Sequence, residues 1–206
     1  KPFSALIAND IPDFHYIGDT QCFSLFTYEP AKENDQLITK IEGETIITAP
    51  SGKQYIRREN ITDWALNQYR QRYGNQVTKE DIFYYIYGIF HSLEYRQRYE
   101  NDLKKLLPHI PFVRTSEAFW TFSQAGRDLA KLHLDYESVE PWPLVEEIKG
   151  NPNSLETYKV KKMSFGKTSD KKEDKTIILY NNNITLRNVP LEAYEYIVNG
   201  KSAIEW

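Results

Sequence analysis

Hydrophobic and polar positions follow different periods in successive parts of the chain. Residues 19–28 and 37–48 are rich in β-branched and aromatic residues, which favour strands. The segment 50–53 (Pro-Ser-Gly-Lys) predicts a tight turn, and a short strand should follow near Tyr55 and Ile56. The first part of the chain is therefore expected to form β-structure.

After residue 61 the apolar positions change to a helical period. Thr62 stands where an N-cap is expected, Ile61 and Leu66 are spaced as a hydrophobic staple, and Gly74 ends the repeat. These signals agree, so they predict a helix between Thr62 and Gly74.

A second helical segment begins at Thr78, which has the spacing of a capping box with Asp81. Residues 82–90 are apolar on nearly every side of such a helix, so they should be buried. A further helix should run from Ser92 until Pro108 stops it.

The last helix of this group is expected to be capped at Ser116. Apolar and aromatic residues recur along it at spacings of three and four as far as His133. Ala125 and Gly126 have small side chains, so a neighbouring helix should be able to approach closely there.

The last third of the chain is expected to be mostly extended, because prolines exclude long helices. Residues 158–161 alternate with period two and residues 176–180 are β-branched, which predicts two strands. Asparagines 181–183 should form a turn into a strand at 184–186, since Asn tolerates positive φ. A last short helix is expected at 191–198.

Together these elements predict an α+β fold, with mixed β portions at both ends of the chain packed around a central group of helices. We expect one domain over residues 1–206, within which residues 1–135 (β, then helical) and 136–206 (a β hairpin plus a short helix) are candidate lobes. The apolar end at 202–206 has no natural cap, which suggests truncation from a longer protein.

Composition is that of an ordinary globular protein, with 40% hydrophobic and 27% charged residues. No apolar run approaches the roughly 18 to 20 residues that cross a bilayer, and the first residues lack a signal-peptide pattern. The single cysteine, Cys22, excludes an internal disulfide and a Cys-rich zinc site, so we expect a cytoplasmic protein.

Charge and aromatic content point in opposite directions. The formal net charge is -3, whereas a protein that binds nucleic acid by overall charge would be basic. Yet the chain holds 15 Tyr, 10 Phe and 4 Trp. One interpretation is a Tyr-rich core whose hydroxyls reach the surface, and the other is that some rings stack on bases or line a groove for a partner.

Catalytic signatures are absent from the sequence. It contains no glycine-rich dinucleotide or phosphate motif, no nucleophile elbow and no Asn-Pro-Pro-aromatic motif of amino-methyltransferases. His15, His91, His109 and His133 show no paired spacing that would predict a metal site. No catalytic residue, metal ligand or cofactor is therefore expected within this chain.

A metal-dependent nuclease is the catalytic alternative, because its core contains Asp/Glu-x-Lys. Four such tripeptides occur, close to the number expected by chance, and only the one at Glu147 has an apolar middle residue. Nearby prolines argue against the strand that this site would need. The four tripeptides begin at Asp102, Glu147, Asp170 and Glu173.

Local charge favours a binding function instead. Residues 157–175 hold seven lysines and three acidic residues, a local charge of +4 in a chain that is negative overall. A solvated, flexible loop at 166–175 would explain this charge, and so would a loop that grips phosphates on a duplex. The basic stretch 96–105 is interleaved with acids and is interpreted as a solvated helix face.

Arginine and asparagine near these lysines have the side chains that recognise bases, because Arg pairs with guanine and Asn with adenine in the major groove. The candidate DNA-binding residues are Arg57, Arg58, Lys159, Lys161, Lys162, Lys167, Lys171, Lys172, Asn181, Asn182, Asn183 and Arg187.

Longer strings of residues give a more specific signal than any spacing. They lie at 11–15 (IPDFH), 21–23 (QCF), 60–64 (NITDW), 81–88 (DIFYYIYG), 91–92 (HS), 94–96 (EYR), 108–112 (PHIPF), 126–133 (GRDLAKLH) and 196–206, and so span nearly the whole chain. In this order, the strings resemble the C-terminal specificity domain of Type ISP restriction-modification enzymes.

This resemblance implies a target-recognition domain that selects the DNA sequence for methylation and cleavage by other domains of one long polypeptide. It implies a non-catalytic domain whose parent enzyme uses S-adenosylmethionine, ATP and Mg. The expected partners are double-stranded DNA and the methyltransferase domain of the same polypeptide, with no membrane, and a monomer is expected.

A structural coupling domain remains an alternative. In that hypothesis the Tyr-rich helices at 62–108 dock on the methyltransferase and DNA is recognised elsewhere. Charge reversal at Lys159, Lys161 and Lys162 would then leave DNA binding unchanged.

Overall fold

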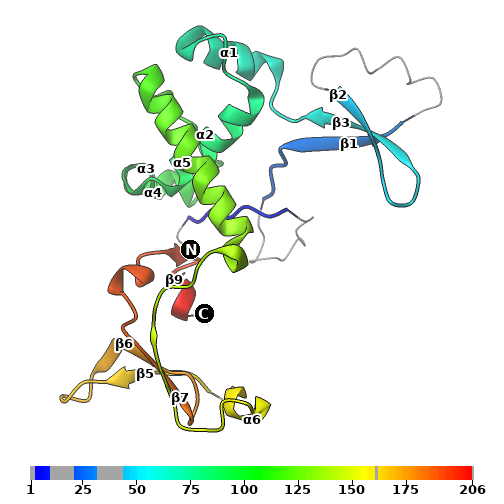
Figure 1. The fold of residues 1–206 in the computed structure, drawn as a ribbon. Coiled ribbons are helices and arrows are strands. Elements are labelled where there is room, and N and C mark those ends of the chain that lie inside the picture. Colours follow the sequence, from blue (N-terminus) through cyan, green and yellow to red (C-terminus); the bar gives the residue numbers. More distant parts are fainter. Residues whose placement is uncertain (1–2, 10–20, 32–43, 161, 206) are drawn as a thin grey trace. The chain divides into compact units, whose positions relative to one another are not determined.

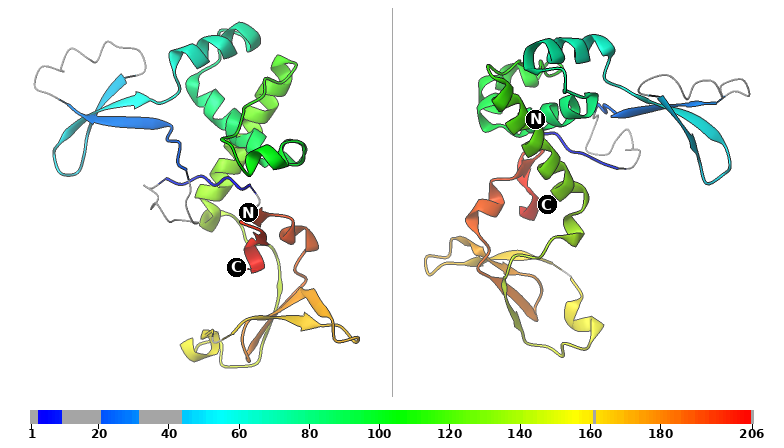
Figure 2. Two further views of the ribbon diagram at one scale, coloured as in Figure 1. Left: turned by 180° about the vertical axis from the view of Figure 1, so that it is seen from behind. Right: turned by 45° about the horizontal axis from the view of Figure 1, so that its top comes forward.

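The computed structural model describes residues 3–9, 21–31, 44–160 and 162–205 (Figure 1). Strands lie toward both ends of the chain and helices in its middle (Figure 2), which confirms the α+β class. By backbone packing the chain divides into two compact units, Ala5–Glu137 and Ser138–Trp206 with Lys1–Ser4. The number of domains and the expected lobes stay a prediction.

The first unit contains a three-stranded antiparallel sheet in the order β1-β3-β2. Its strands are β1 (Phe26–Pro30), β2 (Glu44–Thr48) and β3 (Gln54–Glu59). The expected turn joins β2 to β3: Ala49 N donates to Lys53 O at 2.8 Å, and Gly52 has φ of 80°. Residues 19–20 and 37–43 of the expected strands lie outside the described residues.

Helices follow the sheet in the sequence, and local capping signals set where they begin. They are α1 (Asp63–Tyr73), α2 (Lys79–His91), α3 (Leu93–Arg98), α4 (Glu100–Leu103) and α5 (Ser116–Leu134). Thr62 Oγ1 accepts from Ala65 N at the start of α1, and Gly74 ends that helix with φ of 114°. The capping box of Thr78 and Asp81 opens α2 as expected.

The helix expected from Ser92 to Pro108 is broken, so that prediction was wrong. Tyr99 has φ of -108° and ψ of 18°, which ends α3 and starts α4. Tyr95 Oη donates to His109 O at 2.9 Å, and this bond ties the chain after α4 back to α3.

The N-cap of α5 is Thr115, one residue earlier than expected. Its Oγ1 accepts from Ala118 N at 3.1 Å, whereas Ser116 Oγ donates to Tyr73 O at 2.9 Å. Ser116 therefore links α5 to the end of α1 instead of capping its own helix.

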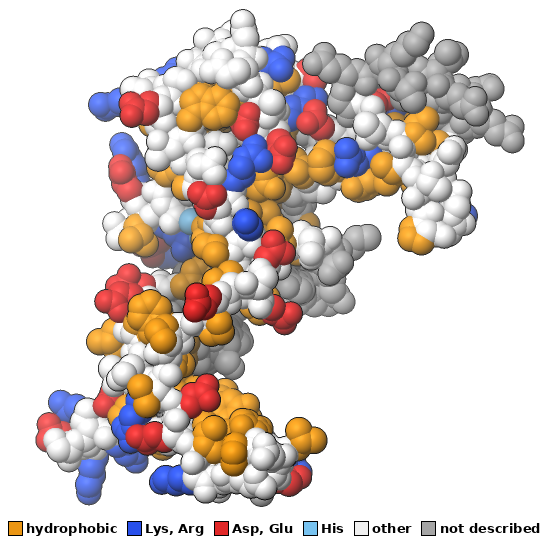
Figure 3. Space-filling model, in the orientation of Figure 1, with side chains coloured by type: hydrophobic (Ala, Val, Ile, Leu, Met, Phe, Trp, Pro, Cys, Tyr) orange, Lys and Arg blue, Asp and Glu red, His pale blue; other side chains and the backbone are white. Residues whose placement is uncertain are grey.

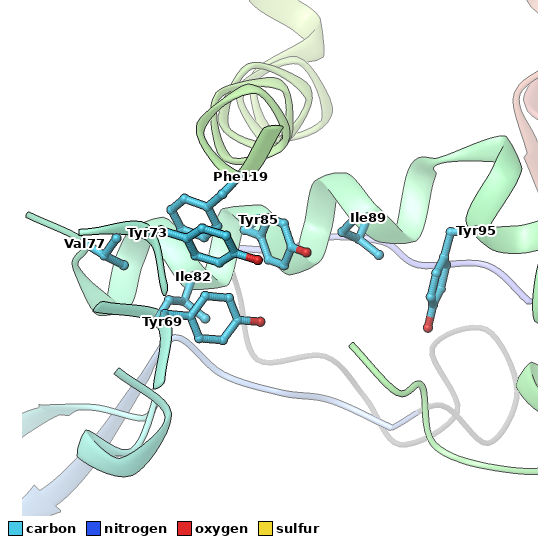
Figure 4. Close-up of a cluster of buried hydrophobic side chains, with 8 residues drawn as sticks. All are labelled: Tyr69, Tyr73, Val77, Ile82, Tyr85, Ile89, Tyr95 and Phe119. Carbon is cyan, nitrogen blue, oxygen red and sulfur yellow. The ribbon is translucent and has the colours of Figure 1, made fainter. Parts of the chain in front are cut away.

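Aromatic rings make up much of the core of the helical part (Figure 4). Tyr73 stacks on Phe119 with ring centroids 4.6 Å apart, and Tyr85 lies 5.0 Å from the same ring. The buried members of this cluster are Tyr69, Tyr73, Val77, Ile82, Tyr85, Ile89, Tyr95 and Phe119.

Helices α2 and α5 cross and pack closely against each other (Figure 1). A Cβ atom on Gly126 would overlap Tyr84 O, and one on Gly88 would overlap Phe122 O. The expected close approach is confirmed at Gly126, with Gly88 on the facing helix as its counterpart, but the expectation was wrong for Ala125, which is exposed.

The second unit contains a four-stranded antiparallel sheet in the order β4-β7-β6-β5. Its strands are β4 (Val145–Ile148), β5 (Ser164–Lys167), β6 (Glu173–Leu179) and β7 (Ile184–Arg187), with the short helix α6 (Leu155–Tyr158) between β4 and β5. The expected hairpin of β6 and β7 around asparagines 181–183 is confirmed, but none of the three has positive φ; the turn is closed by Asn181 Oδ1, which accepts from Asn183 N and Ile184 N.

The strand expected at 158–161 was wrong for its described residues. Thr157 Oγ1 donates to Asn151 O at 2.7 Å, and Asn181 Nδ2 donates to Thr157 O at 2.8 Å. Asn181 Nδ2 also lies within hydrogen-bond distance of Lys159 O, at 3.3 Å, so the carbonyl groups of Thr157 and Lys159 accept from a side chain and do not join a sheet. Lys161 lies outside the described residues.

The helix expected at 191–198 was also wrong in its second half. A short 3-10 helix, η3 (Leu191–Tyr194), is followed by a two-stranded hairpin of β8 (Ile197–Val198) and β9 (Lys201–Ser202). Asn199 and Gly200 have φ of 50° and 88°, the positive values that a two-residue hairpin turn requires. The remaining 3-10 helices are η2 (Tyr136–Ser138) and η4 (Ala203–Glu205).

None of the helices formed by the described residues has the length and the apolar character to cross a membrane.

Candidate nucleic-acid interface

Arg57 and Arg58 are neighbours on β3, so their side chains leave opposite faces of the first sheet. Arg58 Nε donates to Glu44 Oε1 at 2.5 Å, and its Nη1 also pairs with Glu29. These carboxylates, Glu44 first, raise the pKa of Arg58. Arg58 is therefore held inside the sheet by two ion pairs and is a poor candidate for a nucleic-acid contact.

Arg57 lies on the other face, where its cross-strand neighbours are neutral and Glu59, two residues along β3, forms no ion pair with it among the described residues. Its Nε donates to Thr45 Oγ1 at 3.1 Å, and its guanidinium carbon lies 4.4 Å from the centre of the Phe26 ring. Tyr28, directly across the ladder on β1, is 53% exposed. This face therefore presents an oriented cation beside an exposed aromatic ring.

Three of the expected lysines gather at the tip of the hairpin formed by β5 and β6. Lys167 ends β5, Lys171 and Lys172 lie in the turn, and all three are exposed. The turn is closed by Thr168 N donating to Lys172 O at 2.9 Å, and Lys171 has φ of 63°. We name these three residues the hairpin lysines.

The hairpin lysines form no ion pair with any described residue, although Asp170 and Glu173 are exposed beside them. The space-filling view shows basic and acidic side chains together at this end of the second unit (Figure 3). The loop expected at 166–175 is shorter than predicted, because both strands continue almost to the turn. The two strands therefore hold the cations in a defined position.

Lys175 belongs to the same basic stretch but is occupied within the fold. Its Nζ lies 2.6 Å from Glu205 Oε1 and within 6 Å of the ring centres of Phe165 and Tyr194. Lys175 and the amide and hydroxyl of Ser202 lower the pKa of Glu205 to about 2. This lysine stabilises the second unit and is unavailable to an outside anion.

The remaining lysines differ from the hairpin lysines. Lys159 Nζ lies 3.6 Å from Glu156 Oε1, a loose and exposed pair, while Lys162 is exposed and Lys161 lies outside the described residues.

The three asparagines have mainly structural contacts. Asn181 Oδ1 accepts from the amides of Asn183 and Ile184, and its Nδ2 donates to Thr157 O. Asn182 is exposed at the end of the turn, and Asn183 is half-buried. Only Asn182 presents its side chain fully to solvent.

Arg187 on β7 is paired across the sheet with Glu147 on β4, with Nε and Oε1 2.7 Å apart. The pair lowers the pKa of Glu147 and raises that of Arg187. Glu147 does lie on a strand, contrary to the expectation from the nearby prolines, but β4 is exposed along its length. The described residues contain no cluster of three metal-ligating side chains.

The helical part brings together two histidines that lie far apart in the sequence. The rings of His91 on α2 and His133 on α5 have centroids 5.5 Å apart, and Tyr87 Oη lies 2.6 Å from His133 Nδ1. Burial, with Arg96 and His133 nearby, lowers the pKa of His91 to about 4. Sequence spacing cannot show such a pair, because the two residues come from different helices.

The structure thus brings together only some of the candidate DNA-binding residues. Hairpin lysines form one cluster, whereas Arg58, Arg187 and Asn181 are occupied within the fold. Thr45 and Phe26, which orient Arg57, were not among the expected residues. Their role depends on strand register, and nothing in the local sequence pattern signals it.

Residues 1–206 match the family model described as the Type ISP C-terminal specificity domain. The chain belongs to this family. A search of curated proteins found no match. The sequence resemblance is therefore confirmed over the full length of this chain.

Solved structures similar to the specificity domain come from larger enzymes. The ATP-dependent Type ISP restriction-modification enzyme LlaBIII bound to DNA is 31% identical with a TM-score of 0.75, and the match covers 100% of this chain and 12% of that one. A nuclease-deletion mutant of the Type ISP enzyme LlaGI, in complex with a DNA substrate mimic, is 37% identical with a TM-score of 0.55, covering 75% and 11%. A DrdV-DNA complex is 29% identical with a TM-score of 0.63, covering 78% and 16%.

Proposed function

We propose that this specificity domain recognises a particular sequence in double-stranded DNA on behalf of a larger Type ISP restriction-modification enzyme. The observation that carries the proposal is the match of the full chain to a specificity-domain family, together with similar solved structures that are complexes with DNA or a DNA mimic.

The β5–β6 hairpin supports a direct contact with the duplex. A two-stranded antiparallel ribbon has the width to enter the major groove. The hairpin lysines at its tip form no ion pair with any described residue, so binding a phosphate would break no such pair. Phosphate contacts fix the position of a protein on DNA, while base contacts supply the selectivity.

The net charge of -3 is compatible with this function, because affinity depends on the cations that reach phosphates. Each lysine bound to a phosphate displaces condensed counterions, which makes binding weaken as salt increases. The salt dependence of the affinity therefore reports how many phosphates the protein contacts, whatever its net charge.

The test uses the whole natural protein that contains this domain and a pool of random duplexes. Wild-type protein is expected to enrich one sequence. Replacing the three hairpin lysines by alanine should weaken binding to all duplexes and reduce the slope of log affinity against log salt by roughly 2 to 3.

A control variant removes the same charge elsewhere. Lys53, Lys105 and Lys131 are also exposed, and their replacement by alanine should leave the salt slope almost unchanged. If the slope of log affinity against log salt falls by the same amount in both triple variants, the hairpin lysines are not the phosphate contact. If wild-type protein enriches no sequence, the proposed function is wrong.

For the whole polypeptide we propose a wider role, in which this non-catalytic domain directs adenine methylation and DNA cleavage by other domains. Those domains would use S-adenosylmethionine, ATP and Mg, in a monomeric cytoplasmic enzyme. A base change in the target that prevents methylation should then prevent cleavage equally, which assays of both activities on the same duplexes would reveal.

Docking on the methyltransferase domain is a second candidate function, favoured by exposed apolar residues in the helical part. Leu93, Leu106 and Leu107 are 69%, 61% and 54% exposed, respectively. Exposed apolar residues that form one patch mark contacts with another protein surface, and these three leucines are the candidates for such a patch. Replacing all three by serine should separate this role from DNA binding: loss of the contact would lower activity of the enzyme without changing the sequence preference.

A further inference from the structure

Arg57 differs from three other arginines that hold partners in this fold. Arg58 is paired with Glu44 and Glu29, Arg127 with Asp81 and Glu80, and Arg187 with Glu147. Arg57 forms no ion pair within the described part of the chain, and its hydrogen bond to Thr45 uses only Nε. Its two terminal nitrogens, Nη1 and Nη2, are not engaged by any hydrogen bond among the described residues.

The side chain of Arg57 is nonetheless held in place. Thr45 Oγ1 accepts from Nε at 3.1 Å, and the Phe26 ring lies below the guanidinium at 4.4 Å. Thr45 is directly across the ladder from Arg57 on β2, and Tyr28 is directly across on β1. The two contacts therefore orient the plane of the guanidinium, and within the described part of the chain no hydrogen bond engages its outer edge.

A fixed guanidinium plane suits a planar partner with two adjacent acceptors. Guanine presents such a pair in the major groove, at O6 and N7, and a bidentate arginine is its commonest specific contact. A phosphate needs chiefly charge, which a mobile lysine supplies as well. The ordering of Arg57 in advance also reduces the entropy that is lost on binding.

We propose that Arg57 recognises a guanine of the target sequence, with Nη1 and Nη2 donating to its O6 and N7. Thr45 and Phe26 are positioning residues that orient the guanidinium. This inference rests on the proposed DNA recognition and adds to it a specificity-determining residue and the base that it contacts.

The first experiment measures sequence preference with the whole natural protein, by enrichment from random duplexes at one salt concentration. Arg57→Ala should lose the preference for guanine at one position of the target by roughly tenfold to a hundredfold, with the other positions unchanged. Arg57→Lys keeps the charge but lacks the planar fork that Thr45 and Phe26 orient, so it should keep only part of the preference for guanine at the same position. Arg98→Ala, which removes an exposed arginine from α3, is the control and should preserve every preference.

A separate variant tests the positioning role of Thr45. Thr45→Val removes the acceptor and keeps the shape and the β-branch of the side chain. It should weaken the preference at the position that Arg57→Ala affects, by a smaller factor, and change no other position.

The second experiment changes the DNA. Its main measurement uses wild-type protein, so the result does not depend on whether a variant folds. Replacing the preferred guanine by 7-deazaguanine removes N7 and should weaken binding by the wild-type protein. Binding by Arg57→Ala should be insensitive to the same replacement.

Three results would overturn the inference. If Arg57→Ala weakens binding to all duplexes equally and lowers the slope of log affinity against log salt by about one, Arg57 contacts a phosphate and not a base. Equal sensitivity of both proteins to 7-deazaguanine would exclude the N7 contact. An enriched target with no position affected by Arg57→Ala would leave the proposed DNA recognition intact but remove Arg57 from it.

Discussion

At the scale of single residues, buried tyrosine hydroxyls stabilise a stretch of chain that has no helix or strand. Tyr73, Tyr85 and Tyr95 donate to the carbonyl groups of Val113, Pro111 and His109 at 2.9, 2.5 and 2.9 Å. A buried carbonyl without a partner is costly, so these bonds account for hydroxyl groups inside the core. These tyrosines are core residues, and stacking on bases is not needed to explain them.

We predict that Tyr85→Phe lowers the free energy of unfolding by about 1 kcal/mol, because the ring still fills its site but Pro111 O loses its donor. Chemical denaturation measures the change. Tyr28→Phe, at an exposed ring on β1, should change the stability by less than about 0.5 kcal/mol. Equal effects of the two variants would contradict this role of the buried hydroxyl.

His91 should make stability depend on pH. Burial lowers its pKa to about 4 in the folded protein, against roughly 6.5 in an unfolded chain. Between these values the unfolded state binds a proton that the folded state does not. The contribution of His91 to the free energy of unfolding is therefore fully present above about pH 6.5, and it is lost as the pH falls toward 4.

Replacing His91 by glutamine removes this titration. The loss of unfolding free energy between pH 7 and 4.5 should become smaller by about 2 kcal/mol, measured by denaturation at each pH. His109→Gln, at an exposed histidine, is the matched control and should keep the wild-type dependence. An unchanged pH dependence in His91→Gln would show that other groups cause it.

At the scale of elements, the contact between α2 and α5 depends on two glycines that face each other. Gly88 N would lie 2.9 Å from a Cβ on Gly126, and the neighbouring atoms are backbone, which cannot turn aside as a side chain would. The two helices must separate to admit even one methyl group. Their contact brings Phe119 against the rings of α1 and α2.

Gly126→Ala should therefore destabilise the helical part by roughly 1–3 kcal/mol or more, although alanine favours helices. Ala125→Ser adds a group of similar size on the exposed side of α5 and should have a small effect. Thermal unfolding of both variants, followed by circular dichroism, measures the difference. A stabilised Gly126→Ala would mean that the helices separate without cost.

At the scale of the whole molecule, a mildly acidic chain distributes its cations unevenly. Several are neutralised by cross-strand carboxylates, as in Arg58 and Arg187, while the hairpin lysines remain open. The chain passes between the two compact units at Ser4–Ala5 and again at Glu137–Ser138, and every residue of the second connection, from Asp135 to Pro143, is exposed. Exposed connecting segments are preferred sites of proteolysis.

We predict that a protease specific for glutamate first cuts this stretch after Glu137, before any glutamate within α2 or α5. Cleavage at Glu140 is blocked by the proline that follows it. Limited digestion followed by mass spectrometry identifies the site, and Glu137→Gln should abolish the first cut. Earlier cleavage within the helices would contradict the division into two units.

Much of the fold could be predicted, because its signals are local. Thr62, Gly74 and the capping box at Thr78 act within one turn of helix, and asparagines 181–183 form their turn from their own side chains and backbone. The prediction failed at 92–108, 158–161 and 191–198. The first segment breaks at Tyr99, whose backbone leaves the helical conformation. At 158–161 hydrogen bonds to distant residues replace the sheet, and at 191–198 Asn199 and Gly200 form a hairpin turn.

The sequence by itself determined the α+β class, most helix ends and, through the order of its longer strings, the family. Only the tertiary structure decided which cations are open. Arg57 and Arg58 are adjacent and chemically identical, and strand register alone places Phe26 and Thr45 beside one and two carboxylates beside the other. The physical reason is that charge neutralisation and orientation act between side chains in space, whereas helix caps and turns act between neighbours along the chain.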